Sequence, residues 1–174
     1  MLLTVSNLYF EKGHGFVLKP FRKLGVEDAA LVIIGEKPYR HGWYNCYPLR
    51  VLTRFLNAKV KVLTQIPRQW VVSAYKEADL FLFGSEFGCA PLVMYETFAS
   101  STLFVTRDVG NVRDHKEVVK IVRTPDGMAA VARELLRSKS ERASLSGRAY
   151  ELWSRLHTWE TIVDQYETLY DSLL

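Results

Sequence analysis

The stretch ADLFLFGSEFGCAPLVMYETFAS, from Ala78 to Ser100, decides the fold of this chain. Its first part, Asp79–Gly84, is apolar and ends at a glycine, which is typical of a strand buried on both faces of a sheet. A loop with glycine and proline follows, and the largely apolar segment Pro91–Ser100 predicts a helix. A buried strand that leads through a short loop into a helix is the repeating unit of a helix-covered parallel sheet.

The same alternation extends along the chain in both directions. Strands are predicted at Leu2–Ser6, Ala30–Gly35, Lys59–Thr64, Asp79–Gly84, Thr102–Thr106 and Val118–Val122. Helices are predicted at Gly15–Leu24, Pro48–Asn57, Pro67–Ala78, Pro91–Ser100, Asp126–Ser138, Ser140–Leu156 and Thr158–Leu174. Pro20 should bend or restart the first helix. We therefore expect an α/β fold: a doubly wound, mainly parallel, six-stranded Rossmann-like sheet of order 3-2-1-4-5-6, with helices on both faces.

Composition narrows the class of protein. A chain of 174 residues, 48% hydrophobic and 24% charged, suits one globular domain. It has no apolar stretch long enough to span a bilayer and no secretory signal pattern. Cys46 and Cys89 lack metal-ligand spacing and read as free thiols in a reducing, cytoplasmic setting. Without a long run of like charges we expect no nucleic-acid partner. The net charge of +4 is compatible with an anionic ligand or peripheral contact with a membrane, and solvated lysines explain it equally well.

The strand order predicts where a ligand binds. Strands 1 and 4 are neighbours, the chain reverses direction between them, and ligands bind outside their carboxyl ends. The loops Asn7–Gly15 and Ser85–Pro91 should meet there. Lys12 would then face free N–H groups at the start of the following helix, and Gly88 lets the backbone approach closely, which suits a phosphate or pyrophosphate. A solvated Lys12 is the simpler alternative.

Glu96 is unusual because it lies inside an otherwise apolar helix. An unpaired buried carboxylate is costly, so it needs a partner. It could form an ion pair with a lysine or arginine. Its oxygens could instead face ribose hydroxyls in the crevice, as acidic residues do in dinucleotide-binding sheets. The sequence leaves both roles open.

Three stretches, Val5–Leu24, Ala74–Asn111 and His157–Tyr170, together resemble the C-terminal, donor-binding domain of group 1 glycosyltransferases of the GT-B type. The resemblance implies retaining transfer of a sugar from a UDP-, GDP- or ADP-linked donor to an acceptor such as a polysaccharide or lipid-linked glycan. It implies no metal or other cofactor. It also implies that residues 1–174 are one domain of a longer protein whose N-terminal acceptor domain is absent, so the chain should bind donor without turning it over.

The family's signature is two glutamates separated by seven residues. Glu96 matches the second, which holds the nucleotide ribose, whereas Gly88 stands at the first, and Glu86 does not keep the spacing. The family's basic pair on the first loop is an arginine and a lysine. Lys12 matches the lysine, and Asn7 stands roughly where the arginine is usual.

The resemblance thus implies Lys12 and Glu96 as catalytic residues. The implied donor site consists of Asn7, Lys12, Gly13, Gly35, Ile66, Gly88, Cys89, Ala90, Pro91, Leu92 and Glu96. The departures at Gly88 and Asn7 leave an alternative open. In it, the chain is a catalytically impaired nucleotide-sugar-binding or scaffolding module of the same fold.

Overall fold

The computed structural model describes residues 1–26, 28–36 and 59–173. Six parallel strands form one sheet in the order β3-β2-β1-β4-β5-β6, which confirms the predicted doubly wound order. The strands are β1 (Leu2–Val5), β2 (Leu31–Ile34), β3 (Val60–Leu63), β4 (Leu80–Phe83), β5 (Leu103–Arg107) and β6 (Lys120–Val122).

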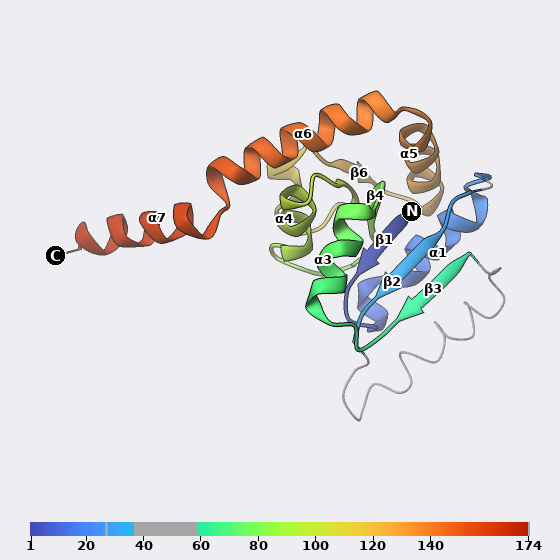
Figure 1. The fold of residues 1–174 in the computed structure, drawn as a ribbon, viewed down its shortest axis with the longest axis horizontal. Coiled ribbons are helices and arrows are strands. Elements are labelled where there is room, and N and C mark those ends of the chain that lie inside the picture. The colour runs from blue at the N-terminus through green and yellow to red at the C-terminus, as the bar shows by residue number, and fades with distance from the viewer. Residues whose placement is uncertain (27, 37–58, 174) are drawn as a thin grey trace.

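Helices follow the strands on both faces of the sheet, with α3 and α4 on one side and α1 on the other (Figure 1). They are η1 (Phe10–Lys12), α1 (His14–Lys23), α3 (Arg68–Glu77), α4 (Leu92–Ala99), η2 (Gly110–His115), α5 (Pro125–Arg137), α6 (Lys139–Leu156) and α7 (Trp159–Asp171), where η marks a 3₁₀ helix. The helix predicted at Pro48–Asn57 lies outside the described residues.

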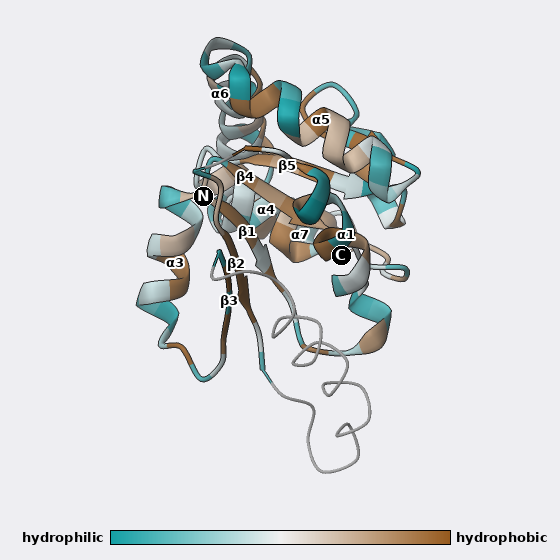
Figure 2. Cartoon of the chain, turned by 90° about the vertical axis from the view of Figure 1, so that its right-hand side faces the viewer, coloured by the Kyte–Doolittle hydropathy of each residue, from teal (hydrophilic) through white to brown (hydrophobic). Residues whose placement is uncertain are grey.

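The central strands β1, β2, β4 and β5 are largely apolar because each face of the sheet carries its own core, whereas each edge strand contains one lysine (Figure 2). Leu82 belongs to one core, together with Val17 of α1 and Met128 of α5. Its neighbour Phe81 points to the other face, where it stacks on Tyr75 of α3. Burial of one large apolar side chain contributes about 1.5–3 kcal/mol, so the two cores account for much of the fold's stability.

Helix α1 continues through Pro20, so of the two effects predicted there the restart is wrong, and the bend stays a prediction. Pro20 removes one N–H from the helical hydrogen bonds, which usually interrupts a helix. Packing compensates for this loss: Val17, Leu18 and Pro20 are buried, and α1 packs along α5.

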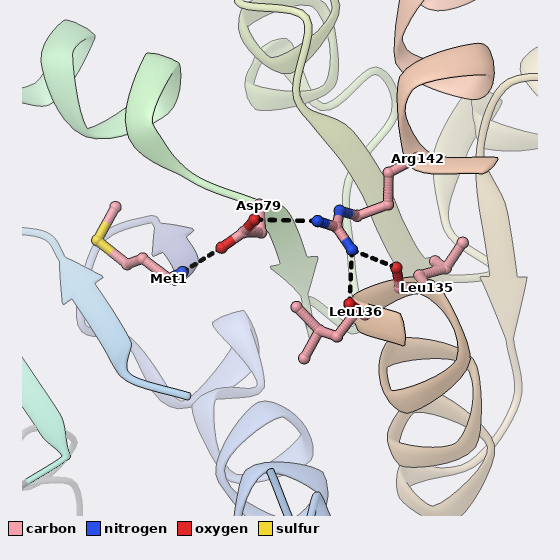
Figure 3. Close-up of polar contacts among 5 residues, drawn as sticks. All are labelled: Met1, Asp79, Leu135, Leu136 and Arg142. Atoms are coloured by element: carbon pink, nitrogen blue, oxygen red, sulfur yellow. Dashed lines mark hydrogen bonds and ion pairs between the residues drawn. The ribbon is translucent and has the colours of Figure 1, made fainter. Parts of the chain in front are cut away.

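A polar cluster ties the amino end of β4 to α5 and α6 (Figure 3). Nη1 of Arg142 donates to the carbonyl oxygens of Leu135 at 2.5 Å and Leu136 at 2.8 Å. Its Nη2 donates to Asp79 at 3.3 Å, and the other carboxylate oxygen of Asp79 pairs with the Met1 ammonium. Arg142 thereby caps the last turn of α5, where helical carbonyls run out of intrahelical donors, although the carbonyl of Leu135 also accepts from the N–H of Ser138 at 3.2 Å.

Helix α7 extends away from the sheet, and none of its residues is buried (Figure 1). It begins at a Thr158 cap whose hydroxyl accepts from the N–H of Thr161 at 3.3 Å. Among the described helices, none combines the length and the apolar character that crossing a membrane requires.

Candidate functional site

The loops after β1 and β4 meet in direct backbone contact, as the strand order predicts. A Cβ built on Gly13 would lie 1.9 Å from the carbonyl oxygen of Gly84, and one built on Gly84 would lie 2.3 Å from that of Gly13. The N–H of Glu86 donates to the carbonyl of Glu11 at 2.9 Å. Only glycine permits backbones to approach this closely, so these glycines bring the two loops together at the carboxyl edge of the sheet.

Two further glycines hold neighbouring loops at this edge. A Cβ on Gly35, which follows β2, would lie 1.9 Å from the carbonyl oxygen of Ser6. Gly110 has φ +58°, and a Cβ there would lie 2.2 Å from the carbonyl oxygen of Cys89. The N–H of Asn111 donates to that same carbonyl at 2.9 Å. The turn after β5 therefore supports the β4 loop, a role that the sequence pattern did not reveal.

The start of α4 offers unpaired N–H groups to the crevice. The helix begins at Leu92 after Pro91, without a side-chain cap. Within the described part of the chain, the N–H groups of Gly88, Cys89, Ala90 and Leu92 donate to no other residue. Free N–H groups at the positive end of a helix dipole form an anion-binding site.

Lys12 ends η1, directly before Gly13, and is half-buried. Among the residues that the structure describes, it has no ion-pair partner. Burial holds the pKa of His14 below its usual range. The positive charge of Lys12 also lowers this pKa. The hydrogen bond between His14 Nε2 and the carbonyl of Asn7, at 3.2 Å, raises it but does not offset the burial. The β1 loop thus carries an unneutralised positive charge beside a neutral histidine.

Glu96 has two partners, both from α3. Its Oε1 accepts from Nη2 of Arg68 at 2.7 Å, and its Oε2 accepts from the hydroxyl of Tyr75 at 2.6 Å. Burial and this hydrogen bond raise the pKa of Tyr75, so the phenol stays protonated and acts as a donor. The ion pair with an arginine, one of the two roles predicted for Glu96, is therefore present. Contact with a ribose remains a prediction.

Gly88, at the position of the family's first glutamate, has φ +159° and open space where a Cβ would lie. A side chain there meets no steric clash but carries backbone strain of about 1–3 kcal/mol. Glu86, the carboxylate nearby in the loop, pairs with Nη1 of Arg107 at 2.9 Å. The guanidinium of Arg107 also lies 4.7 Å from the ring centroid of Phe16, so Glu86 is held against β5 and α1.

All predicted site residues follow the carboxyl ends of the first four strands. Asn7, Lys12 and Gly13 come after β1, Gly35 after β2, Ile66 after β3, and Gly88, Cys89, Ala90, Pro91 and Leu92 after β4, with Glu96 one turn into α4. Ile66 is half-buried against the core of Phe81. Asn7 exposes its side chain and contributes its backbone carbonyl to His14. Sequence reasoning missed Arg68 and Tyr75.

Together these features define a class of protein: a doubly wound α/β domain in which a half-buried lysine and free N–H groups lie after the carboxyl ends of neighbouring strands, the edge at which sheets of this order bind ligands. The model of the family "Glycosyl transferases group 1" matches residues 1–152. The chain belongs to this family.

A curated relative, N-acetyl-alpha-D-glucosaminyl L-malate synthase of Bacillus anthracis, is 28% identical over 180 residues, covering 100% of this chain and 46% of that protein. Anabaena HepE in complex with UDP and glucose superposes with a TM-score of 0.86 at 16% identity, covering 98% of this chain and 48% of that one. Sucrose-phosphate synthase from Thermosynechococcus elongatus superposes with a TM-score of 0.85 at 18% identity, and the match covers 98% of this chain and 45% of that one. The likeness shows a Rossmann-like fold shared with GT-B glycosyltransferases, and the chain spans about half the length of these proteins.

Proposed function

We propose that this chain is the donor-binding domain of a glycosyltransferase, C-terminal in the whole GT-B protein, and that it binds a nucleoside-diphosphate sugar for retaining transfer. The observation that carries the proposal is the backbone contact between the Lys12 loop and the loop that leads from β4 into α4. One side supplies a cation without an ion-pair partner among the described residues, and the other supplies free N–H groups. A diphosphate placed between them is neutralised from both sides.

This geometry matches the demand of sugar transfer. The bond between the anomeric carbon and a diphosphate oxygen breaks, a bond to the acceptor oxygen forms, and the proton of the acceptor hydroxyl passes to the departing diphosphate. Negative charge grows on the departing diphosphate, and preorganised dipoles and a cation stabilise such charge strongly. We assign this task to Lys12 and to the four N–H groups, free among the described residues, in the β4 loop and at the first residue of α4, and we assign ribose binding to Glu96.

The choice of donor class rests on the comparisons. HepE of Anabaena has been solved with UDP and with UDP-glucose, which makes UDP the first ligand to test, with GDP and ADP as alternatives. The relative from Bacillus anthracis carries an N-acetylglucosaminyl group in its name, so an amino sugar belongs in the panel beside glucose. The acceptor would be bound by the rest of the protein, and the domain by itself should not turn the donor over.

A second candidate is a nucleotide-sugar-binding module that no longer catalyses transfer. It is favoured by Gly88, which lacks the carboxylate of the family's first glutamate, and by the pairing of Glu86 with Arg107. Transfer of radiolabelled sugar by the whole protein distinguishes the candidates. An inactive whole protein whose domain still binds the nucleotide supports the module.

Calorimetry of the 174-residue chain with UDP, GDP, ADP and inorganic pyrophosphate tests the proposal. We expect one nucleoside diphosphate to bind at least about tenfold more tightly than the other two and more tightly than pyrophosphate, because base, ribose and diphosphate each add contacts. Failure of all three nucleotides to bind would contradict a donor site.

A further inference from the structure

The two partners of Glu96 differ in how firmly they are held. The side chain of Tyr75 is 1% exposed, and its ring stacks on Phe81 with centroids 5.4 Å apart and planes 5° apart. Its hydroxyl therefore has one position. Arg68 is the first residue of α3, and its side chain is 68% exposed. Among the described residues, Arg68 has no polar contact other than Glu96.

The two partners also lie at different depths. Tyr75 follows Arg68 by seven residues, about two helical turns, so both side chains lie on one face of α3. Helices that follow parallel strands begin at the carboxyl edge of the sheet, which places Arg68 nearer to the crevice than Tyr75. Oε2 of Glu96 is thus bonded on the inner side, and Oε1 on the side of the crevice.

We propose that Tyr75 is a positioning residue of the nucleotide site and that Arg68 is the exchangeable partner of Glu96. The Tyr75 hydroxyl holds Oε2, which keeps Oε1 at the crevice for a ribose hydroxyl. Arg68 occupies Oε1 while no nucleotide is bound. Exposed ion pairs are weak, so a ribose hydroxyl can take the place of the guanidinium. This inference rests on the proposed nucleotide site and adds the residue that orients its ribose contact.

The variant Tyr75→Phe tests the positioning role, since it keeps the ring and removes only the hydroxyl. Calorimetry should show UDP binding weakened by about three- to tenfold, as expected when a charged hydrogen bond is misaligned. Binding of 2′,3′-dideoxy-UDP, which lacks the ribose hydroxyls, should not change. In a Glu96→Ala background, where no carboxylate is left for Tyr75 to hold, Tyr75→Phe should cause no further loss, because Tyr75 acts through Glu96.

Tyr95→Phe is the matched control. Tyr95 precedes Glu96 on α4, but its hydroxyl accepts from Asn111 at 2.8 Å and lies 3.3 Å from Nε2 of His115. Losing that hydroxyl should leave UDP affinity unchanged. Arg68→Gln should bind UDP equally well or more tightly. If Arg68→Gln instead weakened UDP binding by about three- to tenfold, as expected for Tyr75→Phe, Arg68 would contact the ligand directly. That result would overturn the proposal that a ribose hydroxyl replaces Arg68 at Glu96.

Three results would overturn the positioning role: unchanged UDP affinity in Tyr75→Phe, an equal loss for UDP and the dideoxy analogue, or an additive loss in the double variant. A different result would be that the unaltered chain binds no nucleotide. This result would contradict the proposed donor site itself, and therefore also the positioning role of Tyr75.

Discussion

Gly84 and Gly13 lie in direct backbone contact, and a Cβ on Gly84 would come within 2.3 Å of the carbonyl oxygen of Gly13. This contact fixes the distance between the Lys12 loop and the loop that leads into α4. The spacing of the two loops is therefore set by the absence of two side chains, and a substitution at Gly84 alters this spacing without changing a residue of the predicted donor site.

Gly84→Ala should destabilise the fold by about 1–3 kcal/mol, because the added methyl meets backbone rather than a side chain that can move. Gly84 does not require a positive φ, so the loss reports the close approach alone. Chemical unfolding measures it. Gly147→Ala is the control: this glycine lies within α6, nothing lies within 4 Å of the place that an added methyl would take, and alanine there should stabilise by about 0.5–1 kcal/mol. Equal stability of Gly84→Ala and the unaltered chain would mean that the two loops do not meet as described.

The buried histidines should make stability fall on mild acidification. Burial holds the pKa of His14 below the value near 6.5 of an unfolded histidine. Below pH 6.5 the unfolded chain therefore binds more protons than the folded chain, and stability decreases as the pH falls toward the lowered folded pKa. His115 and His157, whose pKa values are also lowered by burial, act in the same direction.

His14→Gln isolates the contribution of His14, since a glutamine amide can donate to the Asn7 carbonyl and does not titrate. Melting temperatures at about pH 7.5, 6.5 and 5.5, which span the ordinary histidine pKa, should fall less steeply in this variant than in the unaltered chain. Some slope should persist, because His115 and His157 remain. Parallel slopes in the two proteins would show that His14 is not buried as a neutral base.

Glu96→Gln should weaken UDP binding by about tenfold while changing the melting temperature little. Glutamine keeps the volume and can still accept from Tyr75, and the exposed ion pair with Arg68 contributes only about 0–1 kcal/mol. Calorimetry and a melting curve on one sample separate the two roles. A collapsed melting temperature with unchanged affinity of the folded protein would assign Glu96 to structure alone.

The order of the sheet could be predicted from the sequence because the four central strands are largely apolar and each strand is followed by a break. The segments around Leu82 and Ile33 are buried on both faces, which leaves a covered parallel sheet as the consistent arrangement. The meeting of the two loops followed from that order. Helix α1 could not be predicted in full from the local sequence. A proline usually interrupts a helix, but the packing of α1 on α5 keeps the helix continuous through Pro20.

The partners of Glu96 could not be predicted, because they depend on the distance between two helices that are separated by a strand. The sequence around Tyr75 does not indicate that its hydroxyl donates a hydrogen bond to a residue of α4. From its neighbours alone, Tyr75 would be assigned to the core as an aromatic residue. The support of Cys89 by Gly110 and Asn111 is likewise a contact between loops after different strands. Such contacts require the relative placement of elements, which hydrophobic periodicity does not specify.

The most direct measurement is the affinity of Lys12→Ala for UDP, determined by calorimetry beside Lys19→Ala. Lys19 is an exposed lysine of α1 outside the predicted site, so it controls for the loss of one positive charge. A charged hydrogen bond contributes about 1.5–3 kcal/mol, so Lys12→Ala should bind UDP at least about tenfold more weakly, with an unchanged melting temperature. Lys19→Ala should bind as the unaltered chain does. Equal affinities in all three proteins would contradict a diphosphate site between the Lys12 loop and the start of α4.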